Sequence, residues 1–268
     1  MTYPHTLIHP EARLAEGVKV DPFTVIHADV EIGEGTWIGS NVTIMDGARI
    51  GKNCRIFPGS VISAIPQDLK FEGEKTTVEI GDNTTIREFV TINRGTKDRW
   101  TTKVGRNCLI MAYCHVAHDC IIGDNCILSN NTQMAGHVVI EDWAILGGMC
   151  ALHQFVRIGR HSFVSGGSLV GKDIPPYVLA CRHPLSYGGI NSVGLKRKGF
   201  TTQTINHIFD IYRIVYNNGM NPTQAVEYLD KEFTASPERD EIMEFIRQSP
   251  RGIIRRYSQE KAEDDVED

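Results

Sequence analysis

Aliphatic residues occupy every sixth position over most of the sequence. The pattern runs without exception through residues 8–62, 80–92 and 104–170. Neither the 3.6-residue period of an amphipathic helix nor the alternation of a half-buried strand places one residue type at every sixth position. A short fixed repeat is instead typical of a solenoid, in which each coil buries its apolar side chains against its neighbours. The sequence therefore predicts an all-β solenoid built from hexapeptide repeats.

Two further positions of the hexad are restricted. Glycine often follows the aliphatic residue, and we expect the backbone to turn at these glycines with little steric cost. The fourth residue after the aliphatic one is small or β-branched, and six of the seven cysteines occupy it. We therefore interpret these cysteines as small buried side chains, not as ligands or nucleophiles. The six are Cys54, Cys108, Cys114, Cys120, Cys126 and Cys150.

Two polar segments interrupt the repeat, residues 64–77 and 94–103. Both contain glycine and charged residues, which favour loops. We expect them to project from the solenoid, where loops on a rigid scaffold commonly carry substrate contacts.

The chain changes character toward its end. From residue 201 onward, apolar residues recur at helical spacing, which predicts helices near 201–217, 222–234 and 237–248. Asn221 and Ser236 each precede a proline and are candidate N-caps.

We accordingly divide the chain into a β-helix domain, residues 1–190, and a C-terminal helical domain, residues 191–268. The acidic stretch at the end, residues 260–268, is expected to fray.

Composition excludes several partners. A formal net charge of −5 gives no basic field for nucleic acid. No apolar run approaches the roughly 18 residues that span a bilayer, so we expect no stable membrane insertion. The first residues show no secretory signal, and the cysteines form no C-x-x-C pair. These features predict a cytoplasmic protein with reduced thiols.

The densest polar signal inside the repeat is MAYCHVAHDC, residues 111–120. If three hexads make one coil of 18 residues, Asp119 stacks on His137, and His118 forms a column with Gly136 and Gln154. Two histidines, a carboxylate and an amide then share one stretch of surface. Such a cluster favours a functional site over isolated surface residues.

Several motifs make the sequence resemble a known family. They are QDLKFEGE (67–74), IREFVTINRGT (86–96), AHDC (117–120), NNTQMAGHV (130–138), GGMCALHQF (147–155), DIPPYV (173–178) and GLKRKGF (194–200). With these motifs and its hexads, the chain resembles the UDP-N-acetylglucosamine O-acyltransferases of lipid A biosynthesis (LpxA-type). The resemblance implies a left-handed parallel β-helix of about nine coils, a homotrimer with active sites between subunits, and no cofactor or metal.

The resemblance also implies a reaction. An (R)-3-hydroxyacyl thioester on acyl carrier protein is attacked by the 3-hydroxyl of UDP-N-acetylglucosamine, the first step of lipid A biosynthesis. His118 matches the general base, which has a pKa suited to removing that proton. Asp119 would fix the tautomer of His118, and the Gly136 N–H would stabilise the oxyanion.

Binding roles follow from the same matching. It implies sugar and phosphate contacts for Asp68, Lys70, His115, His137 and Gln154. It implies nucleotide and diphosphate contacts for His153, Asn191, Arg197 and Lys198. It places Gln67 and Gly166 along the acyl chain, with Gly166 as a ruler for a chain of tetradecanoyl length or longer.

Three positions depart from the family pattern. Val193 replaces a glutamate, Asn93 replaces a common histidine, and Arg182-His183-Pro184 differs from the usual segment. These changes spare the AHDC motif and bear on sugar or acyl preference.

Three alternatives remain open at this point. The sibling N-acyltransferase of the same pathway acylates an amine on a similar scaffold. A γ-type carbonic anhydrase would bind zinc with three histidines, two of them five residues apart, whereas His115 and His118 are three apart. A non-catalytic solenoid would explain the hexads but not the polar cluster.

The C-terminal region also carries two groups of basic residues. We expect them to recruit the acidic carrier protein by electrostatic attraction. The residues are Lys196, Arg197 and Lys198 in one group and Arg251, Arg255 and Arg256 in the other.

Overall fold

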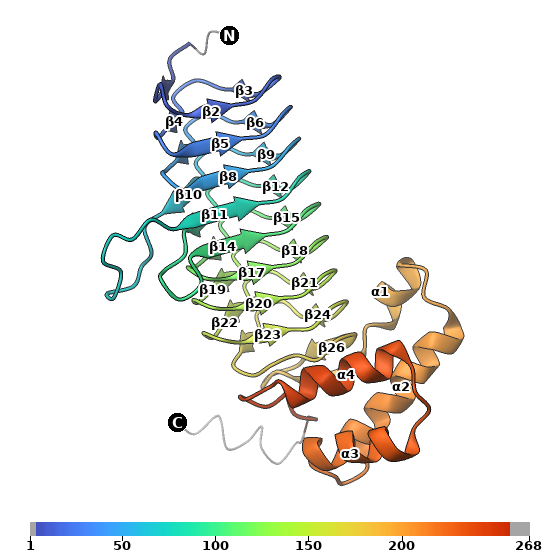
Figure 1. Ribbon diagram of the computed structural model, residues 1–268. Coiled ribbons are helices and arrows are strands. Elements are labelled where there is room, and N and C mark those ends of the chain that lie inside the picture. Colours follow the sequence, from blue (N-terminus) through green and yellow to red (C-terminus); the bar gives the residue numbers. More distant parts are fainter. Residues whose placement is uncertain (1–3, 258–268) are drawn as a thin grey trace.

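The chain winds into a parallel β-helix capped by a small group of helices at its C-terminal end (Figure 1). The computed structural model describes residues 4–257. Three short strands make one coil, and corresponding residues of successive coils pair in register, as Ile26 does with Ile44 and Val116 with Met134. These aliphatic residues point inward and are buried. The predicted six-residue repeat is thus confirmed as the core of the solenoid.

The strands form three sheets, one for each side of the coil. The nine-stranded sheet contains β1 (Leu7–Ile8), β4 (Val25–Ile26), β7 (Thr43–Ile44), β10 (Val61–Ala64), β13 (Thr91–Asn93), β16 (His115–Val116), β19 (Gln133–Met134), β22 (Ala151–Leu152) and β25 (Leu169–Val170). The eight-stranded sheet contains β2 (Arg13–Leu14), β5 (Val30–Ile32), β8 (Ala48–Ile50), β11 (Thr77–Ile80), β14 (Thr101–Val104), β17 (Ile121–Ile122), β20 (Val139–Ile140) and β23 (Arg157–Ile158). The ten-stranded sheet contains β3 (Lys19–Val20), β6 (Trp37–Ile38), β9 (Arg55–Ile56), β12 (Thr85–Ile86), β15 (Leu109–Ile110), β18 (Ile127–Leu128), β21 (Ile145–Leu146), β24 (Phe163–Val164), β26 (Val178–Cys181) and the antiparallel β27 (Ser186–Ile190).

The repeated glycines stand directly before the turns between strands, as predicted, and they also allow close packing between coils. Gly33 and Gly105 do not have positive φ, but a Cβ on Gly33 would lie 2.6 Å from the carbonyl carbon of Gly51 in the next coil. The left-handed backbone falls two residues later, often on asparagine, as at Asn107 with φ of 55° and Asn125 with φ of 60°. Asparagine tolerates this conformation better than most residues.

The six cysteines at the small hexad position are buried free thiols, as predicted. Burial raises the pKa of the Cys114 thiol to about 11, which makes it a poor nucleophile. Cys181, which lies outside the repeat, is half-buried.

Both predicted loops project from the same side of the solenoid (Figure 1). One joins β10 to β11 and the other joins β13 to β14. The coils continue in register across the loops, since Ile62 pairs with Ile92 and Ile86 with Ile110. The loops therefore add surface without disturbing the core.

The C-terminal region contains α1 (Ser192–Arg197), α2 (Thr202–Asn217), α3 (Pro222–Glu232) and α4 (Pro237–Arg247). The last three agree with the predicted helices, and the side chains of Asn221 and Ser236 cap α3 and α4. Sequence periodicity missed α1, because six residues are too few to show a helical period.

The helices pack on the last coil through aromatic residues. Tyr212 of α2 is fully buried and its hydroxyl donates to the carbonyl of Pro176 at 2.5 Å. The Tyr187 ring of β27 stacks on that of Tyr216 with a centroid distance of 4.0 Å. The structure runs from β27 into α1 at residues 190–192, and the division into two domains at residue 190 stays a prediction.

The acidic stretch 260–268 lies outside the described residues. Among the helices of the described chain, none combines the length and apolar character that a bilayer crossing requires.

Candidate active site

His118 lies at the corner between β16 and β17, where the nine-stranded sheet meets the eight-stranded sheet. Its side chain is only 9% exposed, and its Nδ1 lies 2.8 Å from Oδ2 of Asp119. A proton on Nδ1 would be shared with the carboxylate, which leaves Nε2 as the nitrogen with a free lone pair. The predicted pairing of these two residues is present in the structure.

Asp119 is fully buried, and hydrogen bonds from Thr96, Arg99 and His118 hold its carboxylate. Thr96 donates its N–H to Oδ1 at 3.0 Å and its hydroxyl to Oδ2 at 2.7 Å. The Arg99 N–H donates to Oδ1 at 3.2 Å, and the Asp119 N–H donates to Oγ1 of Thr102 at 2.8 Å.

These contacts keep the carboxylate ionised. Burial by itself raises the pKa of Asp119, but hydrogen bonds from Thr96 and His118 outweigh burial, so the pKa lies below its ordinary value. An ionised Asp119 can therefore orient the His118 ring and stabilise its imidazolium form.

Gly136 stacks directly on His118, as the 18-residue spacing predicts. A Cβ at this position would lie 2.6 Å from Cε1 and 2.7 Å from Nε2 of the His118 ring, so glycine alone leaves room for it. The N–H of Gly136 has no acceptor among residues 4–257. At the corner between the eight- and ten-stranded sheets, the equivalent N–H groups are bonded to carboxylates of the next coil. The Asp124 N–H, for example, donates to Asp142 at 2.8 Å. The Gly136 N–H thus remains available beside Nε2.

His137 completes the cluster from the same coil as Gly136. Its Nε2 lies 3.7 Å from Oδ2 of Asp119 and 3.6 Å from Oδ2 of Asp98. Its ring stacks on the exposed ring of Phe155 with a centroid distance of 4.7 Å. Burial lowers the pKa of His137, which favours the neutral ring.

His115 projects from β16 on the outer face of the nine-stranded sheet, and its Nδ1 lies 2.7 Å from Oγ1 of Thr91. Burial and the neighbouring His118 lower the pKa of His115. The site therefore holds two histidines, His118 and His137, beside one ionised carboxylate, with His115 next to His118.

Comparisons with known proteins agree with this geometry. Residues 173–254 match the family profile "Udp N-acetylglucosamine O-acyltransferase; Domain 2", and residues 29–64 and 101–136 match "Bacterial transferase hexapeptide (six repeats)". The acyl-[acyl-carrier-protein]–UDP-N-acetylglucosamine O-acyltransferase of Janthinobacterium sp. (strain Marseille) is 45% identical over 260 residues, covering 95% of this chain and 99% of that protein. The chain belongs to the UDP-N-acetylglucosamine O-acyltransferase family.

Solved structures of the family extend the agreement to the fold. The UDP-N-acetylglucosamine acyltransferase of Bacteroides fragilis superposes with a TM-score of 0.93 at 50% identity, covering 95% of this chain and 100% of that one. The Francisella novicida enzyme superposes with a TM-score of 0.92 at 40% identity, covering 95% and 94%. The predicted left-handed parallel β-helix with C-terminal helices is thereby confirmed. The relatives' names also favour O-acylation over the sibling N-acyltransferase.

In this member of the UDP-N-acetylglucosamine O-acyltransferase family, the predicted sugar-binding loop projects from the solenoid between β10 and β11. Gln67, Asp68 and Lys70 project on the loop between β10 and β11, where the Lys70 N–H donates to Oδ1 of Asp68 at 3.0 Å. Among the described residues no hydrogen bond or ion pair joins these three side chains to His118. Their predicted roles stay predictions.

His153 and Gln154 follow β22 at the corner one coil beyond His137. His153 is exposed, and its Nδ1 lies 3.0 Å from the carbonyl of Gln154. Gln154 beside it is half-buried. The predicted column of His118, Gly136 and Gln154 follows from the coil register.

Asn191 has a structural place in the described chain. Its Oδ1 accepts from the Gly194 N–H at 3.2 Å as the N-cap of α1, and its Nδ2 donates to the carbonyl of His161 at 2.9 Å. Arg197 and Lys198 are exposed near the end of α1, and Nζ of Lys198 lies 3.8 Å from the centre of the Trp143 ring. Asn191 is therefore less available to a nucleotide than the exposed side chains of Arg197 and Lys198.

Gly166 lies at the corner between β24 and β25, at the opposite edge of the nine-stranded sheet from His118. It is exposed, and a Cβ there would lie 2.9 Å from the carbonyl oxygen of Gly148 in the preceding coil. A side chain at Gly166 would therefore lean toward the coils that carry the histidine cluster.

Sequence reasoning missed the residues that hold Asp119, which are Thr96, Arg99 and Thr102. All three come from the segment that interrupts the hexad repeat, so no register position marked them. Their contact with the site becomes visible only in the fold, where β13, which leads into that segment, pairs with β16.

The donor set at the site does not fit a three-histidine zinc centre. Ligand atoms of His118, Asp119 and His137 lie within 4.8 Å of one another, which gives two histidines and one carboxylate. Both carboxylate oxygens already accept hydrogen bonds, and His118 Nδ1 faces Oδ2. That the site needs no metal or cofactor stays a prediction, which elemental analysis of the purified protein can check.

Proposed function

We propose that this protein transfers an (R)-3-hydroxyacyl group from acyl carrier protein to the 3-hydroxyl of UDP-N-acetylglucosamine. The observation that carries the proposal is the paired His118 and Asp119 beside the open N–H of Gly136. Full-length relatives named for this activity support the substrates. In the family that the sequence resembles, this reaction is the first step of lipid A biosynthesis.

The chemistry assigns a task to each of the three residues. Nε2 of His118 removes the proton of the sugar hydroxyl as its oxygen attacks the thioester carbonyl. The Gly136 N–H donates to the oxyanion that forms, and ionised Asp119 stabilises the imidazolium. When the carbon–sulfur bond breaks, the imidazolium returns its proton to the thiolate of the carrier.

The substrate contacts are part of the same proposal. Asp68, Lys70, His115, His137 and Gln154 would contact the sugar and its phosphates. The nucleotide contacts would come from His153, Asn191, Arg197 and Lys198. Gln67 and Gly166 would lie along the acyl chain.

Mass spectrometry of reaction products tests the proposed function. UDP-N-acetylglucosamine is incubated with the protein and a panel of 3-hydroxyacyl carrier proteins of different chain length. A product whose mass equals the UDP-sugar plus one hydroxyacyl group, with an ester that mild base cleaves, supports the proposal. An amide-linked product from a UDP-amino sugar, or no product with any donor, would refute it.

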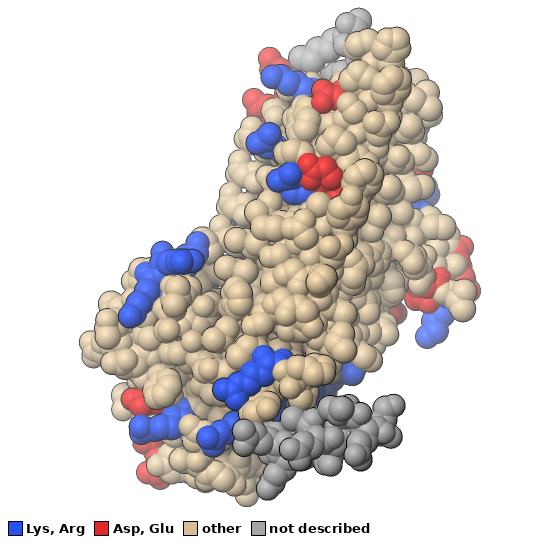
Figure 2. Space-filling model, turned by 180° about the vertical axis from the view of Figure 1, so that it is seen from behind, with Lys and Arg blue, Asp and Glu red and all other residues tan. Residues whose placement is uncertain are grey.

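We propose further that the protein is a homotrimer with its active sites between subunits. The ten-stranded sheet shows an apolar outer face in consecutive coils, formed by Leu109, Ile127, Ile145, Phe163 and Leu179. The outward strand residues of the nine-stranded sheet, from Leu7 to Leu169, include no Lys, Arg, Asp or Glu in the described part of the chain. Figure 2 shows that few charged side chains interrupt the middle of the surface behind the view of Figure 1.

The eight-stranded sheet differs from these two. Its outer face carries ion pairs such as Arg13 with Glu31 and Lys103 with Glu79, as expected for a face in water. A closed ring of identical subunits needs two different contact faces on each copy, which the nine-stranded sheet and the apolar part of the ten-stranded sheet supply. His118 lies at the border between a contact face and the solvent face.

Light scattering should give three times the chain mass of 29.9 kDa. Ile127→Asp with Ile145→Asp, on the ten-stranded sheet, should reduce the mass and the activity together, because a buried unpaired charge is costly. Ile121→Asp, the same change on the eight-stranded sheet, should leave the mass unchanged. A wild-type monomer would refute the proposal.

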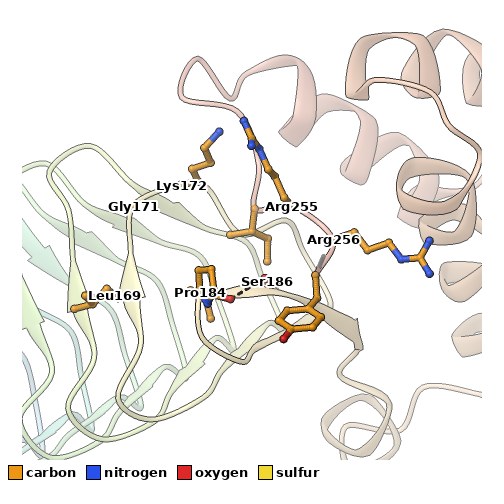
Figure 3. Close-up of a pocket in the computed structure, with 10 residues that line it drawn as sticks. Leu169, Gly171, Lys172, Pro184, Ser186, Arg255 and Arg256 are labelled. Atoms are coloured by element: carbon orange, nitrogen blue, oxygen red, sulfur yellow. Dashed lines mark hydrogen bonds between the residues drawn. The ribbon is translucent and has the colours of Figure 1, made fainter. Parts of the chain in front are cut away.

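The acidic carrier protein would approach the C-terminal end of the solenoid. A pocket of about 390 Å³ opens there between the last coil and the segment after α4 (Figure 3). Its apolar lining comes from Leu169, Pro184, Leu185, Ile254 and Tyr257. Its charged lining comes from Lys172, Arg255 and Arg256, and none of the described residues that line it is acidic.

Charge reversal tests this docking surface. Because Arg255 and Arg256 are exposed, Arg255→Glu with Arg256→Glu should raise the apparent KM for the carrier about tenfold and leave the KM for the UDP-sugar unchanged. The wild-type KM for the carrier should also rise steeply with salt. Lys19→Glu with Lys52→Glu, on the N-terminal coils, changes the net charge equally and should have little effect. Equal effects of the two double variants would contradict local docking.

A further inference from the structure

The segment between β13 and β14 approaches the site from outside the coil that carries His118. Thr96, in this segment, is 5% exposed and donates to both oxygens of Asp119. Its hydroxyl shares Oδ2 with Nδ1 of His118, since each lies within 2.8 Å of that oxygen. Oδ1 is held separately by the N–H groups of Thr96 and Arg99.

We infer that Thr96 is a positioning residue of the acyl transfer. With both oxygens held, the Asp119 carboxylate cannot turn away from the imidazole, so His118 keeps its Nδ1 proton and presents Nε2 to the substrate. The inference rests on the proposed function of His118 and Asp119. It adds a residue that touches neither substrate nor the reacting atoms.

The hydroxyl and the backbone of Thr96 have separable tasks. The segment around Thr96 also supports the loop that carries Asp68 and Lys70, because the Lys97 N–H donates to Glu74 at 3.2 Å and the Arg94 guanidinium lies 5.5 Å from the centre of the Phe71 ring. Disorder of the whole segment would therefore weaken sugar binding and raise KM. Loss of the Thr96 hydroxyl removes its bond to Oδ2 of Asp119 and the acceptor of the Asp98 N–H at 3.3 Å, but it leaves these two contacts to the loop in place and should lower kcat.

The test compares isosteric variants. Thr96→Val removes the hydroxyl but keeps the shape and the N–H, and should lower kcat about tenfold with the KM for UDP-N-acetylglucosamine unchanged, since a hydrogen bond to a charged group is worth at least that factor. Thr96→Ser keeps a hydroxyl and should recover most of the loss. Thr96→Ala serves as a second variant where valine lowers the melting temperature. Thr101→Val, a neighbouring threonine of β14 whose hydroxyl lies 3.4 Å from the carbonyl of Thr102, is the matched control and should keep wild-type kcat.

A double-mutant cycle separates positioning from a general structural effect. In an Asp119→Asn background the added Thr96→Val should cost less than twofold, because Thr96 acts through the carboxylate. The same tenfold loss in both backgrounds, or a Thr96→Val variant with full kcat, would overturn the inference while leaving the proposed function standing. Near wild-type kcat in Asp119→Asn itself would refute the role of the pair, and the inference with it.

Discussion

His118→Ala is expected to lower the turnover of UDP-N-acetylglucosamine by about two to four decades with the fold intact, because general base catalysis typically contributes that much. The sugar hydroxyl is a poor nucleophile until its proton is removed. The remaining rate would come from the Gly136 N–H and from the juxtaposition of the two substrates. Turnover measured at saturating substrate, with circular dichroism and thermal melting of the variant, checks both parts of the expectation.

A second histidine variant serves as the control for His118→Ala. His9→Ala removes an exposed histidine of the first coil, and it should keep wild-type turnover and a similar melting temperature. Near wild-type turnover in His118→Ala would show that another group takes the proton.

Much of the fold could be predicted because the six-residue spacing in the sequence also determines which residues stack in successive coils. Ile26, Ile44 and Ile62 are each placed by sequence spacing alone, and the same spacing stacks them in register. The short helix α1 could not be predicted this way, since it is held by the Asn191 cap and the buried Leu195, not by a period.

The candidate site likewise contains residues that the repeat predicts and residues that it does not. Residues inside the repeat can be predicted to lie together from the 18-residue coil alone, as His118, Gly136 and His137 do. Thr96 and Arg99 belong to an insertion whose path no register fixes, and they emerged only from their hydrogen bonds to Asp119. A repeat therefore predicts which residues stack, but not which side chains reach across from a loop.

Gly166→Met is expected to shift the preferred acyl donor from a 3-hydroxyacyl chain of tetradecanoyl length or longer to one near ten carbons. A methionine at this corner would lean over Gly148, toward the coils that carry the histidine cluster, and would fill space that four methylenes of the longer chain would use. Each buried methylene is worth about 0.8 kcal/mol, so the longer donor would lose about 3 kcal/mol, or about two decades in kcat/KM relative to the shorter one. Competition between the two donors, followed by mass spectrometry of the products, measures the ratio directly.

Gly166→Ala is the control that this corner requires. Its Cβ would already lie 2.9 Å from the carbonyl oxygen of Gly148, so alanine reproduces the local crowding without the long side chain. We expect Gly166→Ala to lower the melting temperature as much as Gly166→Met does, but to keep the long-chain preference. If alanine switched the donor as methionine does, the shift would come from a displaced coil and not from a filled groove. An unchanged donor ratio in Gly166→Met, or a wild-type protein that already prefers the ten-carbon donor, would show that the chain end meets another residue.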